Sequence, residues 1–204
     1  MHCPSKRLYN TTAKARKAYH RINLKGENQK DLLWWREMLP AIPKRDILTD
    51  RQDISSYDMH LYTDASKTHG AAIYGTHWGM IRFEGEEAKE DISSREFSMI
   101  IRAVATWGHL WSGLRIIFHC DNMRVVTGAK SCYVKSEALM RHYRSLQFLT
   151  TVMDFEFHIV HIPGKTNELA DLLSRNILHV AQAKGYWFDS FETKLAKLPH
   201  HSFA

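Results

Sequence analysis

Residues 60–83 read HLYTDASKTHGAAIYGTHWGMIRF, and this stretch decides the fold class. Three short apolar segments, at residues 60–64, 71–75 and 80–83, are separated by small and polar residues. This spacing is typical of short strands joined by turns, which we place at residues 65–70 and at His77-Trp78-Gly79. Because a tight turn reverses the direction of the chain, the three segments predict an antiparallel meander.

Helical and apolar segments alternate after residue 83. Ser93 and Glu96 form a capping-box pattern, and apolar residues then repeat at helical spacing as far as Trp111. A nearly continuous apolar run at residues 114–118 predicts a strand buried on both faces. We expect helices at 122–129 and 136–153, a fifth strand at 155–162, and a last helix that Thr166 or Asn167 caps and that ends near Arg175.

Strands separated by helices add to a sheet in parallel, and the helices cover its faces. The sequence therefore predicts an α/β fold. Its elements follow the order βββαβααβα, and its five-stranded mixed sheet has helices on both faces.

The segments that flank this pattern differ from it in composition. Residues 31–39 form a compact amphipathic helix that Pro40 and Pro43 should stop, and a weaker helix is compatible with residues 13–22. A polar stretch follows, with a boundary near residue 55. We divide the chain into a basic N-terminal extension with a connection-like segment (1–57), a main domain (58–176) and a C-terminal tail (177–204).

The net charge of +6 is concentrated at the N-terminus. Residues 1–30 carry eight Lys or Arg against Glu27 alone, or +7, which leaves −1 for the other residues. Such an arm suits contact with a phosphate backbone, and a solvated helix is an equally good explanation. No apolar run approaches the roughly 18–20 residues of a membrane span, and the N-terminus has no secretory signal pattern.

The three cysteines, Cys3, Cys120 and Cys132, form no CxxC pair. This odd count argues against a disulfide framework or a structural zinc site. It favours a reducing, intracellular compartment, the cytoplasm or the nucleus.

Four carboxylates stand where predicted elements begin or end: Asp64, Glu96, Asp121 and Asp171. Any one of them alone is more often a helix cap or a turn residue. Four together, beside so much apolar sequence, would repel one another unless cations compensated their charge. Hard oxygen ligands favour Mg²⁺, with Mn²⁺ as a substitute, so the set predicts a metal site.

Four segments resemble the ribonuclease H domains of retroelements. They are LYTDAS at 61–66, SREF at 94–97, FHCDN at 118–122 and HIPGKTNELADLLSR at 161–175, the last being similar to the ending HxPGxxNxxADxLSR. The resemblance covers residues 58–176. Residues 33–35 (LWW) resemble the connection that precedes this domain in gypsy or DIRS-like reverse transcriptases, whereas the polymerase motif YxDD is missing. The chain departs from the pattern at His119-Cys120, where small or hydroxyl residues are commoner.

The resemblance implies a ribonuclease H-like fold and a two-metal endonuclease. Two Mg²⁺ ions about 3.5–4 Å apart would be held by the four acids, and the RNA strand of an RNA–DNA hybrid would be cut to leave 5′-phosphates. His161 stands where the family has a mobile histidine that assists proton transfer or product release. The implied partners are the hybrid and a reverse transcriptase polymerase domain; we expect no membrane contact and a monomeric domain.

The contacts to the hybrid are less well defined. We assign substrate binding to Ser66, Asn122, Arg124, Lys130 and Arg141. The basic residues around the two middle helices, with Lys135 and Arg144 added, would hold phosphates of the DNA strand, or would form a solvated helix face. Asn167 and Arg175 are expected to anchor the last helix.

Two other functions share this fold. The domain could be a catalytically silent nucleic-acid-binding module, against which the four acids argue. Integrases and transposases need Glu as the last acid, and residues 161–171 do not resemble theirs.

Overall fold

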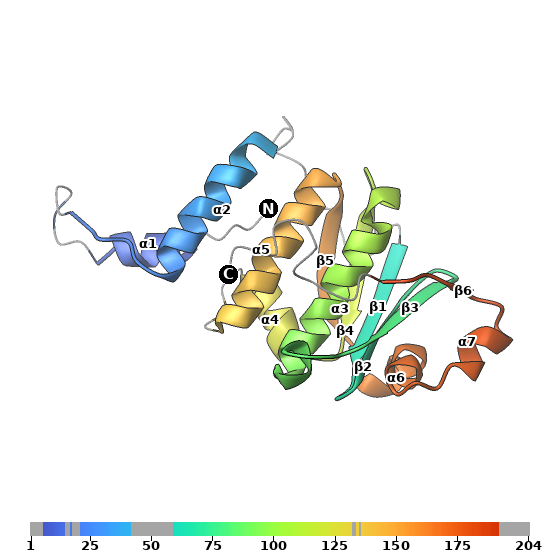
Figure 1. The fold of residues 1–204 in the computed structure, drawn as a ribbon. Coiled ribbons are helices and arrows are strands. Elements are labelled where there is room, and N and C mark those ends of the chain that lie inside the picture. The colour runs from blue at the N-terminus through green and yellow to red at the C-terminus, as the bar shows by residue number, and fades with distance from the viewer. Residues whose placement is uncertain are drawn as a thin grey trace.

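The computed structural model describes residues 6–14, 17, 21–41, 59–131, 134 and 136–191. A six-stranded sheet lies at its centre, in the order β5-β4-β1-β2-β3-β6 (Figure 1). Three strands form the expected antiparallel meander: β1 (Met59–Ala65), β2 (His69–Tyr74) and β3 (His77–Arg82). β4 (Arg115–Cys120) pairs in parallel with β1, and β5 (Glu156–His161) pairs in parallel with β4. The mixed α/β sheet is thus confirmed.

Helices cover both faces of the sheet, as expected (Figure 1). One face carries α3 (Ile92–Trp107), α4 (Met123–Ser131) and α5 (Glu137–Val152). The other carries α6 (Glu168–Ser174) and α7 (His179–Ala183). Three single 3₁₀ turns, η2 (Glu87–Lys89), η3 (Gly108–Leu110) and η4 (Gly164–Thr166), join these elements. No helix among the described residues is long and apolar enough to cross a membrane.

The sheet has six strands, so the expected number of five is wrong. β6 (Trp187–Phe188) pairs in parallel with β3 at the sheet edge. A two-residue strand carries no periodic pattern, so the sequence contains no signal for it. The chain then continues to Phe191, a buried residue that packs on Trp107. The division of the chain at residues 57 and 176 stays a prediction.

The turn expected at residues 77–79 is also wrong, because these residues belong to β3. Gly79 lies inside β3, opposite Ala72, and the ring of Phe191 occupies the space that a Cβ would need. The absence of a side chain at Gly79 therefore allows the Phe191 ring to pack closely against β3. The turn itself is at Gly75, which has a φ of 58°, a left-handed conformation that glycine adopts without strain.

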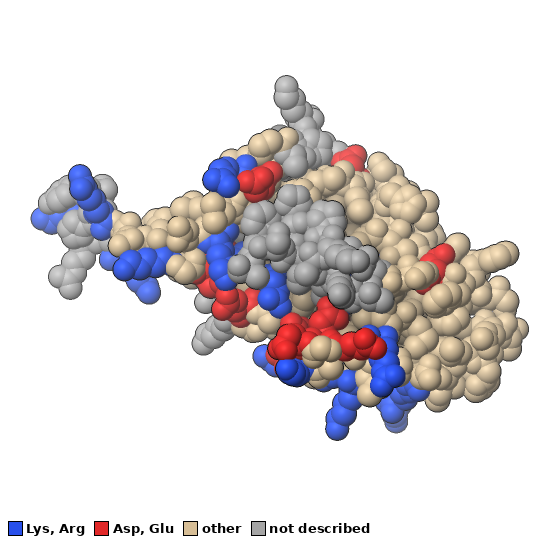
Figure 2. Space-filling model, in the orientation of Figure 1, with Lys and Arg blue, Asp and Glu red and all other residues tan. Residues whose placement is uncertain are grey.

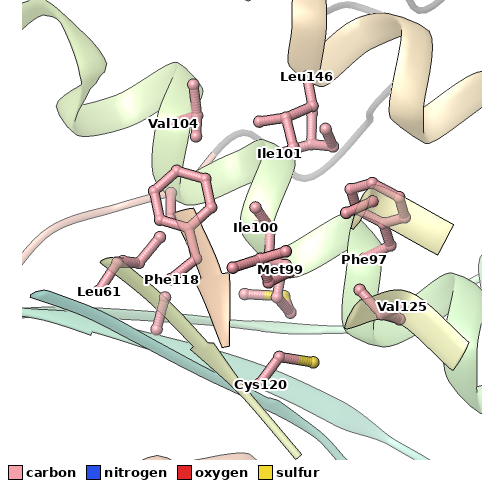
Figure 3. Close-up of a cluster of buried hydrophobic side chains, with 14 of the residues drawn as sticks. Leu61, Phe97, Met99, Ile100, Ile101, Val104, Phe118, Cys120, Val125 and Leu146 are labelled. Atoms are coloured by element: carbon pink, nitrogen blue, oxygen red, sulfur yellow. The ribbon is translucent and has the colours of Figure 1, made fainter. Parts of the chain in front are cut away.

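The main core lies between the sheet and helices α3, α4 and α5. Leu61, Phe118 and Cys120 point from β1 and β4 toward Ile100 of α3 and its neighbours, and all four are fully buried (Figure 3). The strands thus alternate between this core and the face that α6 covers, since successive side chains point to opposite sides.

Two N-terminal helices lie outside α5: the second packs on α5, and the first packs on the second (Figure 1). They are α1 (Lys6–Thr12) and α2 (Glu27–Ala41). Trp34 and Met38 of α2 form a small buried cluster with Phe148, and the Trp34 indole donates to the carbonyl of Arg144 at 3.0 Å.

Two expectations for this region are wrong. The first helix ends at Thr12, and residues 13, 14, 17, 21 and 22 are not helical. α2 continues past Pro40, which is tolerated because it falls in the last turn and removes only one helical hydrogen bond. Pro43 lies outside the described residues.

The capping box at the start of α3 is replaced by a simpler cap. Asp91, one residue before the helix, accepts a hydrogen bond from the Ser94 amide at 3.1 Å. Ser93 is therefore not the cap. Glu96 is the fifth helical residue, and its carboxylate is not used at the helix end and can take part in other interactions. α3 ends at Trp107, and Trp111 follows η3 as a fully buried residue.

Candidate metal and catalytic site

The four expected carboxylates meet at one end of the sheet. Asp64 lies near the end of β1, Glu96 in α3, Asp121 directly after β4 and Asp171 in the middle of α6. β1 and β4 are parallel neighbours, so Asp64 and Asp121 lie at the same end of the sheet, where both strands finish. Two helices from opposite faces bring in the other two acids.

Burial and repulsion between carboxylates raise the pKa of three of these acids, Asp64, Glu96 and Asp121. Burial raises the pKa of Asp64 to about 6, helped by the charges of Asp121 and Asp171 and opposed by a hydrogen bond from Ser174. Burial also raises the pKa of Glu96 well above its usual range, and the charges of Asp64 and Asp121 add to this effect. The four carboxylates are therefore one electrostatically coupled cluster.

Asp121 links the cluster to β5. Its pKa is raised, mainly by burial and further by Asp171, while its own backbone amide and the imidazole of His161 oppose the shift. His161 Nε2 lies 3.1 Å from the Asp121 carbonyl oxygen and carries the proton in that hydrogen bond. His161 is exposed at the end of β5, beside the acids. The structure thus brings all five residues assigned to catalysis together.

The raised pKa of Asp64 predicts that this carboxylate lowers the stability of the metal-free protein at neutral pH relative to its contribution near pH 4. The folded protein binds this proton more tightly than the unfolded chain, so stability falls as pH rises from about 3.8 to about 6. Asp64→Asn should therefore increase the free energy of unfolding in EDTA at pH 7.5, by up to about 3 kcal/mol.

Urea unfolding at pH 7.5 and pH 4 measures this difference. The gain from Asp64→Asn should disappear near pH 4, and Glu156→Gln, at an exposed acid on β5, serves as the control. If Asp64→Asn is no more stable than wild type at pH 7.5, the charged Asp64 carboxylate does not destabilise the folded protein.

α6 supplies side chains that hold two of the acids. Ser174 donates a hydrogen bond to Oδ2 of Asp64, and Arg175 pairs with Oδ1 of Asp171 through Nε at 2.8 Å. The buried Asn167, at the start of α6, donates to the Thr63 carbonyl at 2.9 Å. Asn167 therefore anchors the helix, as expected, whereas Arg175 pairs with Asp171 one turn earlier on the same helix, so its expected anchoring role stays a prediction. The contact of Ser174 was missed, although its position three residues after Asp171 places both on one helix face.

The donor set suits a hard divalent cation. Glu96, Cys120 and Asp121 each offer a possible ligand atom, and these atoms lie within 4.8 Å of one another. Cys120 is a free, buried thiol whose pKa is raised well above its usual range by burial and by the Glu96 charge. It stays neutral, as a weak donor to Glu96 at 3.9 Å. The carboxylates would then be the ligands, and a cation would relieve their repulsion. Cys3 and Cys132 lie outside the described residues.

Two residues assigned to substrate binding are engaged within the protein. The Ser66 hydroxyl accepts from the amides of Thr68 and His69, so it shapes the β1–β2 turn. Asn122 accepts from the Arg124 amide at 3.0 Å, at the start of α4, and donates to Ser93 of α3 at 3.2 Å. The Asn122 side chain thus has partners within the protein, and its contact with substrate, like that of Ser66, stays a prediction.

The basic residues around α4 and α5 differ in exposure. Arg124 is exposed and lies 3.9 Å from Asp91, and Lys130 is exposed in the last turn of α4. Arg141 pairs with Glu90 at 3.0 Å. Figure 2 shows acidic side chains beside basic ones along the lower edge of this face. Contacts from Arg124, Lys130 and Arg141 to phosphates stay predictions, and Lys135 lies outside the described residues.

Arg144 belongs to the interior instead. It is 1% exposed and forms ion pairs with the fully buried Asp31 and with Glu27 of α2. The expectation that it contacts phosphates or solvent is wrong, because α2 covers this side of α5.

The comparisons with known proteins give structural neighbours that are RNase H domains. No family model matches the sequence, and no curated protein matches it. RNase H1 from the halophilic archaeon Halobacterium salinarum is 20% identical, with a TM-score of 0.48, over 60% of this chain and 98% of that one. LC11-RNase H1, solved in complex with an RNA/DNA hybrid, is 18% identical, with a TM-score of 0.49, over 61% and 99%. The foamy viral protease-reverse transcriptase in complex with double-stranded DNA is 15% identical, with a TM-score of 0.38, over 78% of this chain and 30% of that one.

Proposed function

We propose that this chain is a ribonuclease H of retroelement type, which hydrolyses the RNA strand of RNA–DNA hybrids. The observation that carries the proposal is the coupled cluster of Asp64, Glu96, Asp121 and Asp171, brought together from four separate elements. Buried carboxylates lower the stability of a fold, and the binding of catalytic cations is a function that accounts for their presence here. The similarity of residues 161–175 to the HxPGxxNxxADxLSR ending supports the retroelement origin, of gypsy or DIRS-like type.

The four carboxylates would hold two Mg²⁺ ions, with Mn²⁺ as a substitute. Bound there, such ions would lower the pKa of an attacking water and would stabilise the leaving 3′-oxygen of the scissile phosphate. The protein's own contribution is to hold the acids rigidly. Asp64 is fixed by Ser174, Asp171 is fixed by Arg175, and Glu96 comes from a helix that Asp91 caps.

Selectivity for the hybrid would come from the shape of its groove and from contacts to 2′-hydroxyl groups. The N-terminal part of the chain is basic, and its described residues include the exposed Lys14, Arg21 and Lys25. Basic side chains gather at the α1 end of the molecule in Figure 2. This part of the chain would add affinity for phosphates that weakens as salt is raised.

Cleavage of a labelled RNA–DNA hybrid with Mg²⁺ or Mn²⁺ tests the proposal. Single-stranded RNA and duplex DNA of the same sequence serve as substrate controls. We expect metal-dependent cutting of the hybrid's RNA strand alone, with 5′-phosphate products. A protein that binds the hybrid but never cuts it with either metal would be a nucleic-acid-binding module, the alternative that the sequence left open.

His161 provides a second prediction. Its imidazole lies beside Asp121, exposed, where it can exchange protons with groups at the site. His161→Ala should lower kcat by about 100-fold, at the lower end of general acid–base effects and less than the loss from any of the four acids. Single-turnover cleavage measures the chemical step and multiple-turnover cleavage adds product release. An unchanged kcat in both would make His161 a purely structural residue.

A further inference from the structure

Ser174 is the last residue of α6, and it is fully buried. Its hydroxyl donates a hydrogen bond to Oδ2 of Asp64 on β1. The same oxygen lies 2.9 Å from the backbone carbonyl of Asp171. A hydroxyl has one proton to give, so these two acceptors compete for it and hold the Ser174 oxygen between the two acid-bearing segments.

The contact with Asp64 restricts how that carboxylate can turn. The terminal torsion of an Asp side chain is broad and roughly two-fold, so packing alone specifies it poorly. With Oδ2 held by Ser174, Oδ1 and the remaining lone pair of Oδ2 stay available to a cation. No other side-chain donor to the Asp64 carboxylate is found among the described residues.

The same contact fixes α6 against β1. Asn167 joins the start of the helix to the Thr63 carbonyl, and Ser174 joins its end to the Asp64 side chain. Asp171 lies between these two anchors. The relative placement of Asp64 and Asp171 therefore depends on Ser174 at one end of α6 and on Asn167 at the other.

We propose that Ser174 is a positioning residue, whose hydroxyl orients Asp64 toward Asp171 so that the two carboxylates bind one cation together. The inference rests on the proposed metal-dependent function. Ser174 acts through Asp64 and makes no contact with substrate.

Titration of the protein with Mn²⁺ by calorimetry, without nucleic acid, tests the proposal. Ser174→Ala should weaken Mn²⁺ binding about 10-fold or more, in the range found when the partner of a metal ligand is removed. Mg²⁺-dependent cleavage should require a correspondingly higher Mg²⁺ concentration for half-maximal rate. Mn²⁺ affinity within about twofold of wild type would overturn the proposal.

Ser145→Ala is the matched control. Ser145 is also fully buried in a helix, and its hydroxyl also donates to a carbonyl of the preceding turn, that of Arg141, at 3.2 Å. This hydrogen bond involves no residue of the candidate metal site. Its removal should leave Mn²⁺ affinity unchanged, which separates a general loss of helix stability from a loss of orientation.

Two further variants distinguish orientation from packing. Ser174→Cys keeps the volume but donates weakly, so it should bind Mn²⁺ as poorly as Ser174→Ala. Ser174→Thr keeps the hydroxyl and should recover most of the affinity. Full affinity in Ser174→Cys would show that the volume of the side chain matters and the hydrogen bond does not.

The shift in melting temperature of the metal-free protein is a readout that needs neither metal nor cleavage. Because Ser174 acts through Asp64, the shifts caused by Ser174→Ala and Asp64→Ala, each of which removes the contact, should not add in the double variant. Additive shifts would contradict the proposal. If wild type binds Mn²⁺ and the Ser174 series behaves as expected while no hybrid is cut, only the proposed catalytic function fails.

Discussion

Asp64→Asn will abolish cleavage of the hybrid while the protein still binds it. Asn keeps the shape and an acceptor for Ser174, but it removes the charge that attracts the cations. Because removing even a partner of a metal ligand costs about 10- to 100-fold, losing the ligand itself should lower the cleavage rate by more than about 100-fold. Asp121→Asn should behave in the same way, since Asp121 belongs to the same coupled cluster.

Binding of the hybrid should remain within about threefold of wild type or tighten slightly. Phosphate contacts dominate such affinity, and removing a carboxylate beside a phosphate reduces repulsion. Cleavage and filter binding, measured in the same buffer, give both quantities. Glu156→Gln is the control for loss of an acid, because Glu156 is exposed and lies at the start of β5, away from the end that carries Asp121 and His161. Full cleavage by Asp64→Asn would refute the assignment of the site.

Arg144→Ala will destabilise the protein strongly without changing the chemistry of the site. Arg144 and Asp31 are 1% and 0% exposed, and the substitution would leave the carboxylate of Asp31 without its closest partner. Breaking a buried ion pair in this way costs about 3–5 kcal/mol. Burial already raises the pKa of Asp31, against the opposing effect of Arg144, so the loss should be severe at neutral pH.

Urea unfolding in the presence of Mg²⁺ measures this loss. Arg36→Ala removes an exposed ion pair with Glu37 on the same helix and should change stability by less than about 0.5 kcal/mol. The double variant Asp31→Leu, Arg144→Met should recover much of the stability, because no unpaired charge stays buried. Cleavage by folded Arg144→Ala at low temperature should remain near wild type. A change below about 1 kcal/mol would show that α2 does not depend on this pair.

The same pair shows where sequence reasoning failed. Arg144 was grouped with Arg124 and Arg141 because they are close in sequence and equally charged. Only the packing of α2 on α5 decides that Arg144 is buried, and this packing joins residues more than 100 positions apart. Local periodicity contains no information on such a contact.

Side chains at the site were predicted unevenly. The four acids and His161 could be found from their positions at element boundaries and from the resemblance. For Asn122, contact with the hybrid and a turn role were both open; its side chain accepts from the backbone at the start of α4 and reaches Ser93, and contact with the hybrid stays a prediction. Ser174 was not singled out, because a serine near a helix end is common and its partner is 110 residues away.

The sequence by itself determined the first five strands, the helices between them and the positions of the four acids along the chain. Alternating and continuous apolar runs predicted the meander and β4, since each side chain's face follows from local backbone geometry. The tertiary structure decided that β6 joins the sheet and that Gly79 lies within β3. It also decided that Arg144 is buried and that Ser174 forms the hydrogen bond that orients Asp64. Each of these depends on a contact between distant segments. Such a contact stabilises the protein only once the intervening chain has folded and brought the two segments together.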